Sequence, residues 1–113
     1  MTLGEISWVD LPPKGGHAQS GRRPAIIVQS QASSGRIPTV LVIPLTTPLD
    51  ALRFPGTVLV EADPGNGLRR TSVARIFQLT ALDRRYLSDR IGVVTSKVLD
   101  EIWHAFDQLT GRQ

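Results

Sequence analysis

The sequence Gly21-Arg22-Arg23-Pro24-Ala25-Ile26-Ile27-Val28 places two arginines and a proline directly before a run of apolar residues. Proline fixes its own φ angle and biases the residue before it toward an extended backbone. The segment from Pro24 to Ser30 is apolar almost throughout, which predicts a buried, central strand. Arg23 would then stand at the entrance of that strand, where its planar guanidinium can grip a phosphate. The simpler alternative is one more surface arginine.

Other segments on both sides of this stretch have the apolar patterns and flanking turns of strands. They are Ile6–Leu11, Thr39–Ile43, Gly56–Glu61, Thr71–Leu79 and Arg90–Val94. We expect Pro44 to stop the third strand and residues 45–54 to be irregular. Asp63-Pro64-Gly65-Asn66-Gly67 predicts a tight turn between strands.

The C-terminal segment has the pattern of an amphipathic helix. We expect Ser96 to cap its N-terminus and Gly111 to end it. Apolar residues recur on one face, namely Val98, Leu99, Ile102, Ala105, Phe106 and Leu109. Asp83 should cap a short helical turn that runs through Leu87. These elements predict an α+β, mainly β fold, a compact barrel-like sheet with helices at its edge.

Length and charge indicate one small domain with an anionic partner. The chain has 113 residues, which fits a single domain over residues 1–113. Its net charge is +3, and only Lys14 and Lys97 among its basic residues are lysines. Arginine suits bidentate phosphate recognition and stacking on bases, which favours nucleic acid or an acidic protein segment as partner. A genome rich in arginine codons is the equally weighted alternative.

Several classes of protein are disfavoured. No apolar run is long enough to cross a bilayer, and Glu5 and Asp10 interrupt any N-terminal signal segment, so a cytoplasmic location is the default. The sequence has no cysteine, which removes disulfides and thiolate metal sites. Glu61 and Asp63 with His17 lack a recognised metal spacing, and no Walker loop or dinucleotide motif is present. We therefore expect no metal and no cofactor.

Four residues supply the groups that RNA cleavage without a metal requires. A base must remove the 2′-hydroxyl proton, cations or donors must stabilise the phosphorane, and an acid must protonate the departing 5′-oxygen. His17 titrates near neutrality in a glycine-rich loop, Arg23 and Arg75 are cations, and Thr46 offers a hydroxyl. Each also has a plainer interpretation. His17 could be a solvent-exposed loop histidine, Thr46 a turn cap, and Arg75 a residue on the wet face of its strand.

An ordered series of motifs resembles the MazF/PemK family of toxin endoribonucleases, including its PemK/Kid branch. The series consists of Gly4-Glu5-Ile6 with Trp8, Gly16-His17, Gly21-Arg22-Arg23-Pro24, Ile43-Pro44-Leu45-Thr46, Gly67-Leu68, Ser72-Val73 with Gln78, Leu82-Asp83 and Ile91-Gly92. It covers nearly the whole chain. The resemblance implies an SH3-like small barrel of the CcdB/PemK type with a C-terminal helix.

The resemblance also implies a function. It predicts a toxin that cuts single-stranded RNA in a sequence-specific way without metal, leaving a 2′,3′-cyclic phosphate and a 5′-hydroxyl. A homodimer and a cognate antitoxin partner are further implications. Arg23 and Thr46 match the catalytic arginine and threonine of the MazF branch, and His17 and Arg75 match PemK/Kid residues. We expect RNA contacts from Arg22, Gln19, Thr47, Phe77 and Gln78.

Two positions depart from the family pattern. Phe77 stands where the family commonly carries Asp or Glu, and Thr80 replaces a common basic residue. Phenylalanine cannot move a proton, although it can stack on a base. This leaves a noncatalytic relative that binds RNA or an antitoxin as one alternative. A gyrase inhibitor like CcdB is another, but such toxins end in Trp-Gly-Ile, whereas this sequence ends in Gly111-Arg112-Gln113 and Trp103 precedes His104.

Overall fold

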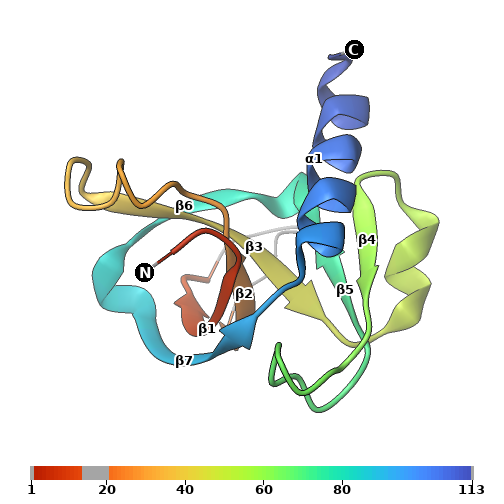
Figure 1. Ribbon diagram of the computed structural model, residues 1–113, viewed down its shortest axis with the longest axis horizontal. Coiled ribbons are helices and arrows are strands. Elements are labelled where there is room, and N and C mark those ends of the chain that lie inside the picture. Colours follow the sequence, from red (N-terminus) through yellow and green to blue (C-terminus); the bar gives the residue numbers. More distant parts are fainter. Residues whose placement is uncertain (1, 14–20, 113) are drawn as a thin grey trace.

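The computed structural model describes residues 2–13 and 21–112. Within them the strands are β1 (Glu5–Leu11), β2 (Gly21–Ile27), β3 (Thr39–Thr46), β4 (Thr57–Val60), β5 (Ser72–Arg75), β6 (Thr80–Asp83) and β7 (Leu87–Val93). Three short 3-10 helices, η1 (Leu49–Arg53), η2 (Ile76–Gln78) and η3 (Arg84–Tyr86), connect strands, and α1 (Ser96–Thr110) follows the last one. Figure 1 shows α1 rising beside β4 and β5.

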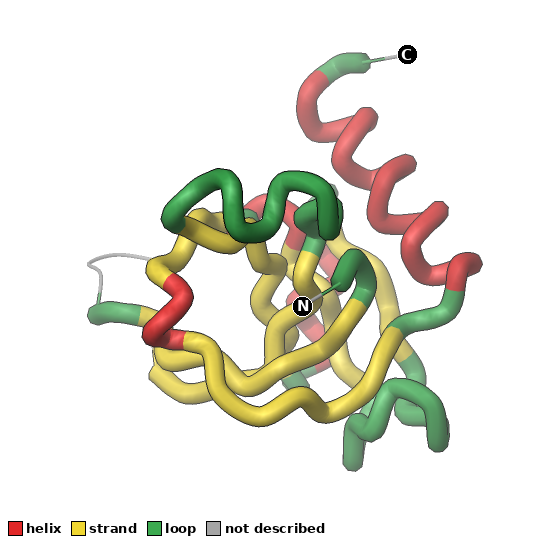
Figure 2. Tube along the Cα trace, turned by 60° about the vertical axis from the view of Figure 1, so that its left-hand side comes forward, coloured by secondary structure: helices red, strands yellow, loops and turns green. Residues whose placement is uncertain are grey.

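The strands form one curved antiparallel sheet in the order β4-β5-β3-β2-β1-β7, and β6 also pairs with β3. Figure 2 shows the strands curling into a small, barrel-like body. β2 lies between β1 and β3, so the prediction that it is central is confirmed. Its predicted bounds are wrong, because β2 runs from Gly21 to Ile27 rather than from Pro24 to Ser30, and Arg23 lies inside the strand rather than before it. The predicted mainly β fold with a C-terminal helix is also confirmed.

Both faces of the central strands are buried, because side chains alternate between two apolar clusters. One cluster contains Ile6, Ile26 and Ile43 and receives Ile102 from α1. The other contains Val9, Ala25, Ile27 and Val42, on the opposite face of the sheet. Burial on both faces explains why the stretch after Arg23 is apolar without alternation.

The prediction that Pro44 ends the third strand is wrong. β3 continues through Pro44, which lies opposite Ala25 of β2, and reaches Thr46. On its other side β3 pairs with β6 over residues 39–42 and with β5 over residues 45 and 46. Pro44 therefore lies where one neighbour ends and the next begins, so its missing N–H costs little.

The predicted strand Thr71–Leu79 is too long: only β5 within it is a strand, η2 follows, and β6, which was not predicted, begins at Thr80. Leu45 lies opposite Ala74 of β5, whereas Val42 lies opposite Thr80 of β6. From one pair to the other, the chain advances three residues along β3 but six residues along the partner segment. The three extra residues of the partner segment form η2. The segment after Thr46 is likewise less irregular than predicted, since it contains η1, and β7 begins at Leu87 rather than Arg90.

The predicted C-terminal cap of α1 is confirmed, but the predicted N-terminal cap is wrong. Thr95, not Ser96, caps α1, because its hydroxyl accepts a hydrogen bond from the Val98 backbone N–H at 3.2 Å. Gly111 ends the helix in the left-handed conformation at φ 77°, as predicted. Ile102 and Ala105 are buried, but Phe106 and Leu109 of the predicted apolar face are 36% and 38% exposed.

Two local predictions are confirmed. The Asp83 carboxylate accepts a hydrogen bond from the Arg85 N–H at 3.0 Å and so caps η3. The turn at residues 63–67 is organised by buried Asn66, whose backbone N–H donates to the Asp63 carboxylate at 2.7 Å. Among the residues that the structure describes, no helix has the length and apolar character needed to span a bilayer.

Candidate active site

Arg23 and Thr46 lie on the same face of the sheet at neighbouring strand ends. Ala25 of β2 pairs with Pro44 of β3, and continuing this register by two residues sets Arg23 opposite Thr46. Because side chains alternate along a strand, both lie on the face that carries Ala25 and Val42. Both are half-buried. The apolar cluster ends at these two polar residues.

Arg75 joins this face from the other side of β3. Leu45 pairs with Ala74, and continuing the register by one residue sets Arg75 opposite Pro44. Arg23 and Arg75 therefore flank β3 on one face, with Thr46 between the two strands that carry them. The sequence pattern predicted each residue separately, and strand pairing brings these three together.

The arginines of this cluster lie close enough for their charges to interact. Burial lowers the pKa of Arg23 below its ordinary value. Burial also lowers the pKa of Arg75, and the positive charges of Arg23 and Arg53 lower it further. Repulsion between like charges is unfavourable for an empty site. It is relieved when an anion such as a phosphate lies among the three guanidinium groups.

Arg75 carries a buried hydrogen-bond donor that has no partner among the described residues. The Nε atom of Arg75 is buried and makes no hydrogen bond there. Leaving a buried donor unsatisfied costs free energy, and native structures rarely do so away from functional sites. An acceptor from a bound ligand would satisfy this donor.

A stack of rings and guanidinium groups extends from Arg75. Its guanidinium carbon lies 4.9 Å from the centroid of the Phe77 ring. The rings of Phe77 and Phe54 meet edge to face, with centroids 5.6 Å apart, and Arg53 lies 4.4 Å above Phe54. Arg53 is further held by Asp50, whose carboxylate accepts its Nη1 hydrogen bond at 2.8 Å.

Sequence reasoning missed Arg53 and Phe54. They lie in a segment that was predicted to be irregular, and no local pattern links them to Arg75. The exposure of Phe54, 41%, is known only from the structure, so the sequence offered no signal that would have singled them out. Gln78 follows Phe77 at the end of η2 and is half-buried, next to the stack.

Arg22 and Thr47 do not join the cluster of Arg23, Thr46 and Arg75, although each is adjacent in sequence to one of its members. Arg22 precedes Arg23 in β2, so its side chain lies on the opposite face of the sheet. There it donates to the Ser88 hydroxyl at 3.1 Å and stacks over Trp8 at 4.8 Å. Thr47 is exposed just beyond the end of β3. His17 and Gln19 lie outside the described residues.

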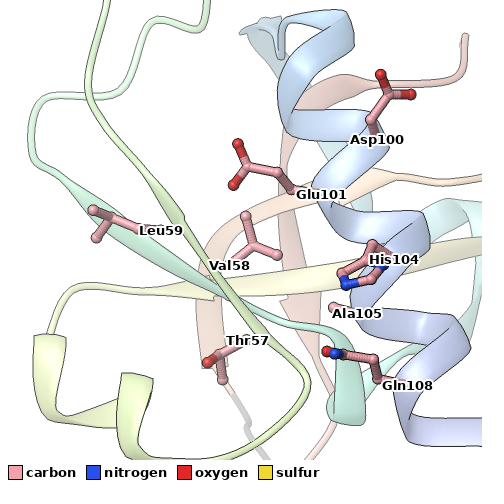
Figure 3. A pocket seen from close by; sticks show the side chains of 8 residues that line it. All are labelled: Thr57, Val58, Leu59, Asp100, Glu101, His104, Ala105 and Gln108. Carbon is pink, nitrogen blue, oxygen red and sulfur yellow. The ribbon is translucent and has the colours of Figure 1, made fainter.

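A separate hollow of about 420 Å³ lies between β4 and α1. Figure 3 shows Glu101, His104 and Gln108 projecting from α1 toward β4. This hollow is lined by carboxylates and one exposed histidine, with no arginine among its described lining residues, so it does not suit a phosphate. His104 lies on the surface, as predicted. The described residues hold no group of three metal-binding side chains.

Comparison with known proteins places this chain in a family. The model of PemK-like, MazF-like toxins of type II toxin–antitoxin systems matches residues 2–110. The chain is 31% identical to endoribonuclease MazF6 of Mycobacterium tuberculosis over 103 residues, 90% of each chain. It is 27% identical to endoribonuclease EndoA of Bacillus subtilis, covering 88% of this chain and 84% of that protein.

Solved structures share the fold. A crystal structure of MazF from Deinococcus radiodurans superimposes with a TM-score of 0.83 at 25% identity, over 98% of this chain and 96% of that one. A mycobacterial endoribonuclease in complex with its cognate antitoxin gives a TM-score of 0.76 at 24% identity, over 98% and 95%. The chain therefore belongs to the family of PemK-like, MazF-like toxins, and the predicted resemblance is confirmed.

Proposed function

We propose that this protein is a toxin endoribonuclease that cuts single-stranded RNA without a metal ion. The observation that carries the proposal is the set Arg23, Thr46 and Arg75 on one sheet face, where burial and then the neighbouring positive charges lower the pKa of Arg75. Relatives over nearly the whole chain are named endoribonucleases, which supports the same conclusion.

The proposed reaction is transfer of the phosphoryl group to the neighbouring 2′-oxygen. The 2′-hydroxyl loses its proton to a base, its oxygen bonds to phosphorus, and the bond from phosphorus to the 5′-oxygen breaks as that oxygen takes up a proton. The products are a 2′,3′-cyclic phosphate and a 5′-hydroxyl. Arg23 and Arg75 neutralise the negative charge of the phosphorane, and the Thr46 hydroxyl donates a hydrogen bond to it.

Proton transfer falls to His17 in this proposal. A histidine titrates near pH 6.5 and can act as base or acid at neutral pH. Phe77, which replaces the family's usual carboxylate, has no proton to exchange. It instead gives Arg75 an aromatic surface at 4.9 Å, which fixes the guanidinium without neutralising it.

The remaining predicted residues are proposed to hold the RNA on either side of the cleaved bond. Phe77 offers a ring for a base and Gln78 a polar group beside the cluster, while Thr47 supplies a hydroxyl just beyond the end of β3. Arg22 supplies a cation on the opposite face of β2, where it is fixed by Ser88. Gln19 lies outside the described residues, and its role in RNA contact remains a prediction.

We further propose that the toxin acts in the cytoplasm as a homodimer and that a cognate antitoxin inhibits it. Trp103, Phe106 and Leu109 expose apolar surface along α1, which is the surface expected of a subunit interface. One relative of the same fold is described as a complex with its antitoxin.

A cleavage assay tests the proposed function directly. Purified protein should cut a long single-stranded transcript in excess EDTA, and mass spectrometry of the fragments should find 2′,3′-cyclic phosphate ends. Binding of the transcript without cleavage would instead support the noncatalytic alternative. Inhibition of DNA supercoiling by gyrase, with no RNA cleavage, would support the CcdB-like alternative.

A further inference from the structure

A second pocket, of about 640 Å³, lies beside the catalytic cluster, and its function is unassigned. This volume is within the range of small-molecule sites, which hold ligands the size of a nucleotide. Its walls come from Trp8 on β1, Pro24 on β2, the loop between β4 and β5, and β7.

The pocket is connected to the proposed active site through two pairs of neighbours along the chain. Pro24 follows Arg23, and Thr47 follows Thr46, and both Pro24 and Thr47 line the pocket. Strand alternation turns Arg23 toward the catalytic face and Pro24 toward the pocket. Only the end of β3 and the start of β2 therefore separate a phosphate at Arg23 from a group in the pocket.

The chemistry of the lining suits a nucleotide. Arg69, Arg70 and Arg90 contribute three cations, of which Arg90 also forms an ion pair with Glu5 at 3.8 Å, and the described lining residues include no carboxylate. Apolar surface comes from Trp8, Leu68 and Ile91. A flat base can pack against an indole or a guanidinium plane, while its phosphates attract the remaining arginines.

The loop that carries Arg69 and Arg70 is held in place. The side-chain amide of Asn66 donates to the Glu61 carbonyl at 2.8 Å, and its oxygen accepts from the Leu68 N–H at 3.0 Å. Gly67 adopts φ 68°, and a Cβ there would clash with the Ile91 carbonyl of β7. This close packing fixes the loop against β7, so the pocket is formed before a ligand arrives.

We propose that this pocket binds the nucleoside next to the cleaved phosphodiester, with its flanking phosphate held by Arg69, Arg70 and Arg90. The proposal rests on the proposed ribonuclease function and assigns it a second subsite. An acidic protein segment would also be attracted by the arginines. Pro24 and Thr47 line the pocket directly beside Arg23 and Thr46 in the sequence, so a nucleotide next to a phosphate at those residues lies within reach of the pocket, which favours RNA.

Intrinsic fluorescence can test the proposal without any cleavage. The chain has two tryptophans, so Trp103→Phe leaves Trp8 as the reporter. The probes are short 2′-O-methyl RNA oligonucleotides, which lack the attacking hydroxyl, and a polyglutamate peptide of matched charge. Arg69→Gln/Arg70→Gln removes two pocket cations, and Arg36→Gln/Arg112→Gln is a charge-matched control on exposed residues elsewhere.

We expect the oligonucleotides to quench Trp8 and the pocket double variant to bind them at least about tenfold more weakly than the control double variant. Equal weakening by both double variants, or no weakening by the pocket variant, would overturn the proposal. Quenching by polyglutamate but not by RNA would overturn it in favour of a protein segment. Absence of RNA cleavage by the unaltered protein would contradict the proposed function separately, since the quenching readout needs no cleavage.

Discussion

The ring of Phe54 meets the ring of Phe77 edge to face, with their centroids 5.6 Å apart and their planes inclined at 60°. This contact joins the residue that follows η1 to η2 and holds Phe77 beside the guanidinium of Arg75. A carboxylate at position 77 would pair with Arg75 and lower the positive charge of the cluster. The aromatic ring keeps Arg75 in position while leaving its charge available for a phosphate.

Replacing Phe77 should lower the affinity of the protein for RNA. In Phe77→Leu the side chain stays apolar but loses its aromatic face, and base stacking of this kind contributes about 1–3 kcal/mol. We expect KM for a transcript to rise about tenfold or more with a smaller change in kcat. Leu41→Ala, on an exposed and distant position of β3, is the control. Equal KM values for Phe77→Leu and the unaltered protein would contradict a stacking role.

Arg75→Gln should reduce activity without reducing stability. The lowered pKa of Arg75 means that its charged form is less favourable in the folded protein than in the unfolded chain. Arg75 stays protonated in both the folded protein and the unfolded chain from about pH 5 to 9. The cost in folding free energy is therefore constant over this range and gives no pH dependence. Thermal unfolding should show an unchanged or higher Tm for Arg75→Gln. A clear fall in Tm would contradict the repulsion between guanidinium groups.

Salt and phosphate should reveal the same repulsion. Added sulfate or inorganic phosphate should raise the Tm of the unaltered protein more than that of Arg75→Gln, because an anion relieves the crowding of Arg75 with Arg23 and Arg53. Sodium chloride at matched ionic strength separates specific binding from screening. An equal response of both proteins to every salt would show that the cluster does not bind anions.

The pH profile should depend on His17. If His17 exchanges the proton, kcat/KM should vary with a group that titrates near about pH 6.5. His17→Gln should remove that dependence and lower the rate by about a hundredfold or more. His104→Gln, on the exposed face of α1, is the matched control. An identical pH profile in His17→Gln would assign the proton transfer to another group.

The helix cap offers a test of the fold. Thr95→Ala removes the hydroxyl that accepts the Val98 N–H, which should cost about 1 kcal/mol and lower Tm by roughly 4 °C. Ser96→Ala, one residue further into the helix, should leave Tm within about one degree of the unaltered protein. A larger loss from Ser96→Ala than from Thr95→Ala would restore the cap predicted from the sequence.

The sequence predicted local structure well and long-range pairing poorly. β2 and the turn at residues 63–67 follow from apolar runs and turn residues that act locally. The early end of β5 within Thr71–Leu79 depends on how β3 is shared between β5 and β6, which no local pattern encodes. The helix cap failed for a different reason, because Thr95 and Ser96 are both good capping residues.

The candidate site shows the same division. Arg23, Thr46 and Arg75 were predicted as single residues, from a strand entrance, a strand end and a charge within an apolar strand. Their placement on one face follows from the register of β2, β3 and β5. Arg53 joins them through η1 and could not be predicted, because its contact with this face exists only in three dimensions.

The most direct test compares two adjacent arginines on opposite faces of β2. Under single-turnover conditions with a long single-stranded transcript in EDTA, Arg23→Ala should lower the cleavage rate by about 10²–10³-fold, the loss expected when one charge-stabilising group is removed. Arg22→Ala should mainly raise KM, and Arg36→Ala should change neither value. Cleavage by Arg23→Ala at the rate of the unaltered protein would contradict the central claim that Arg23 stabilises the phosphorane.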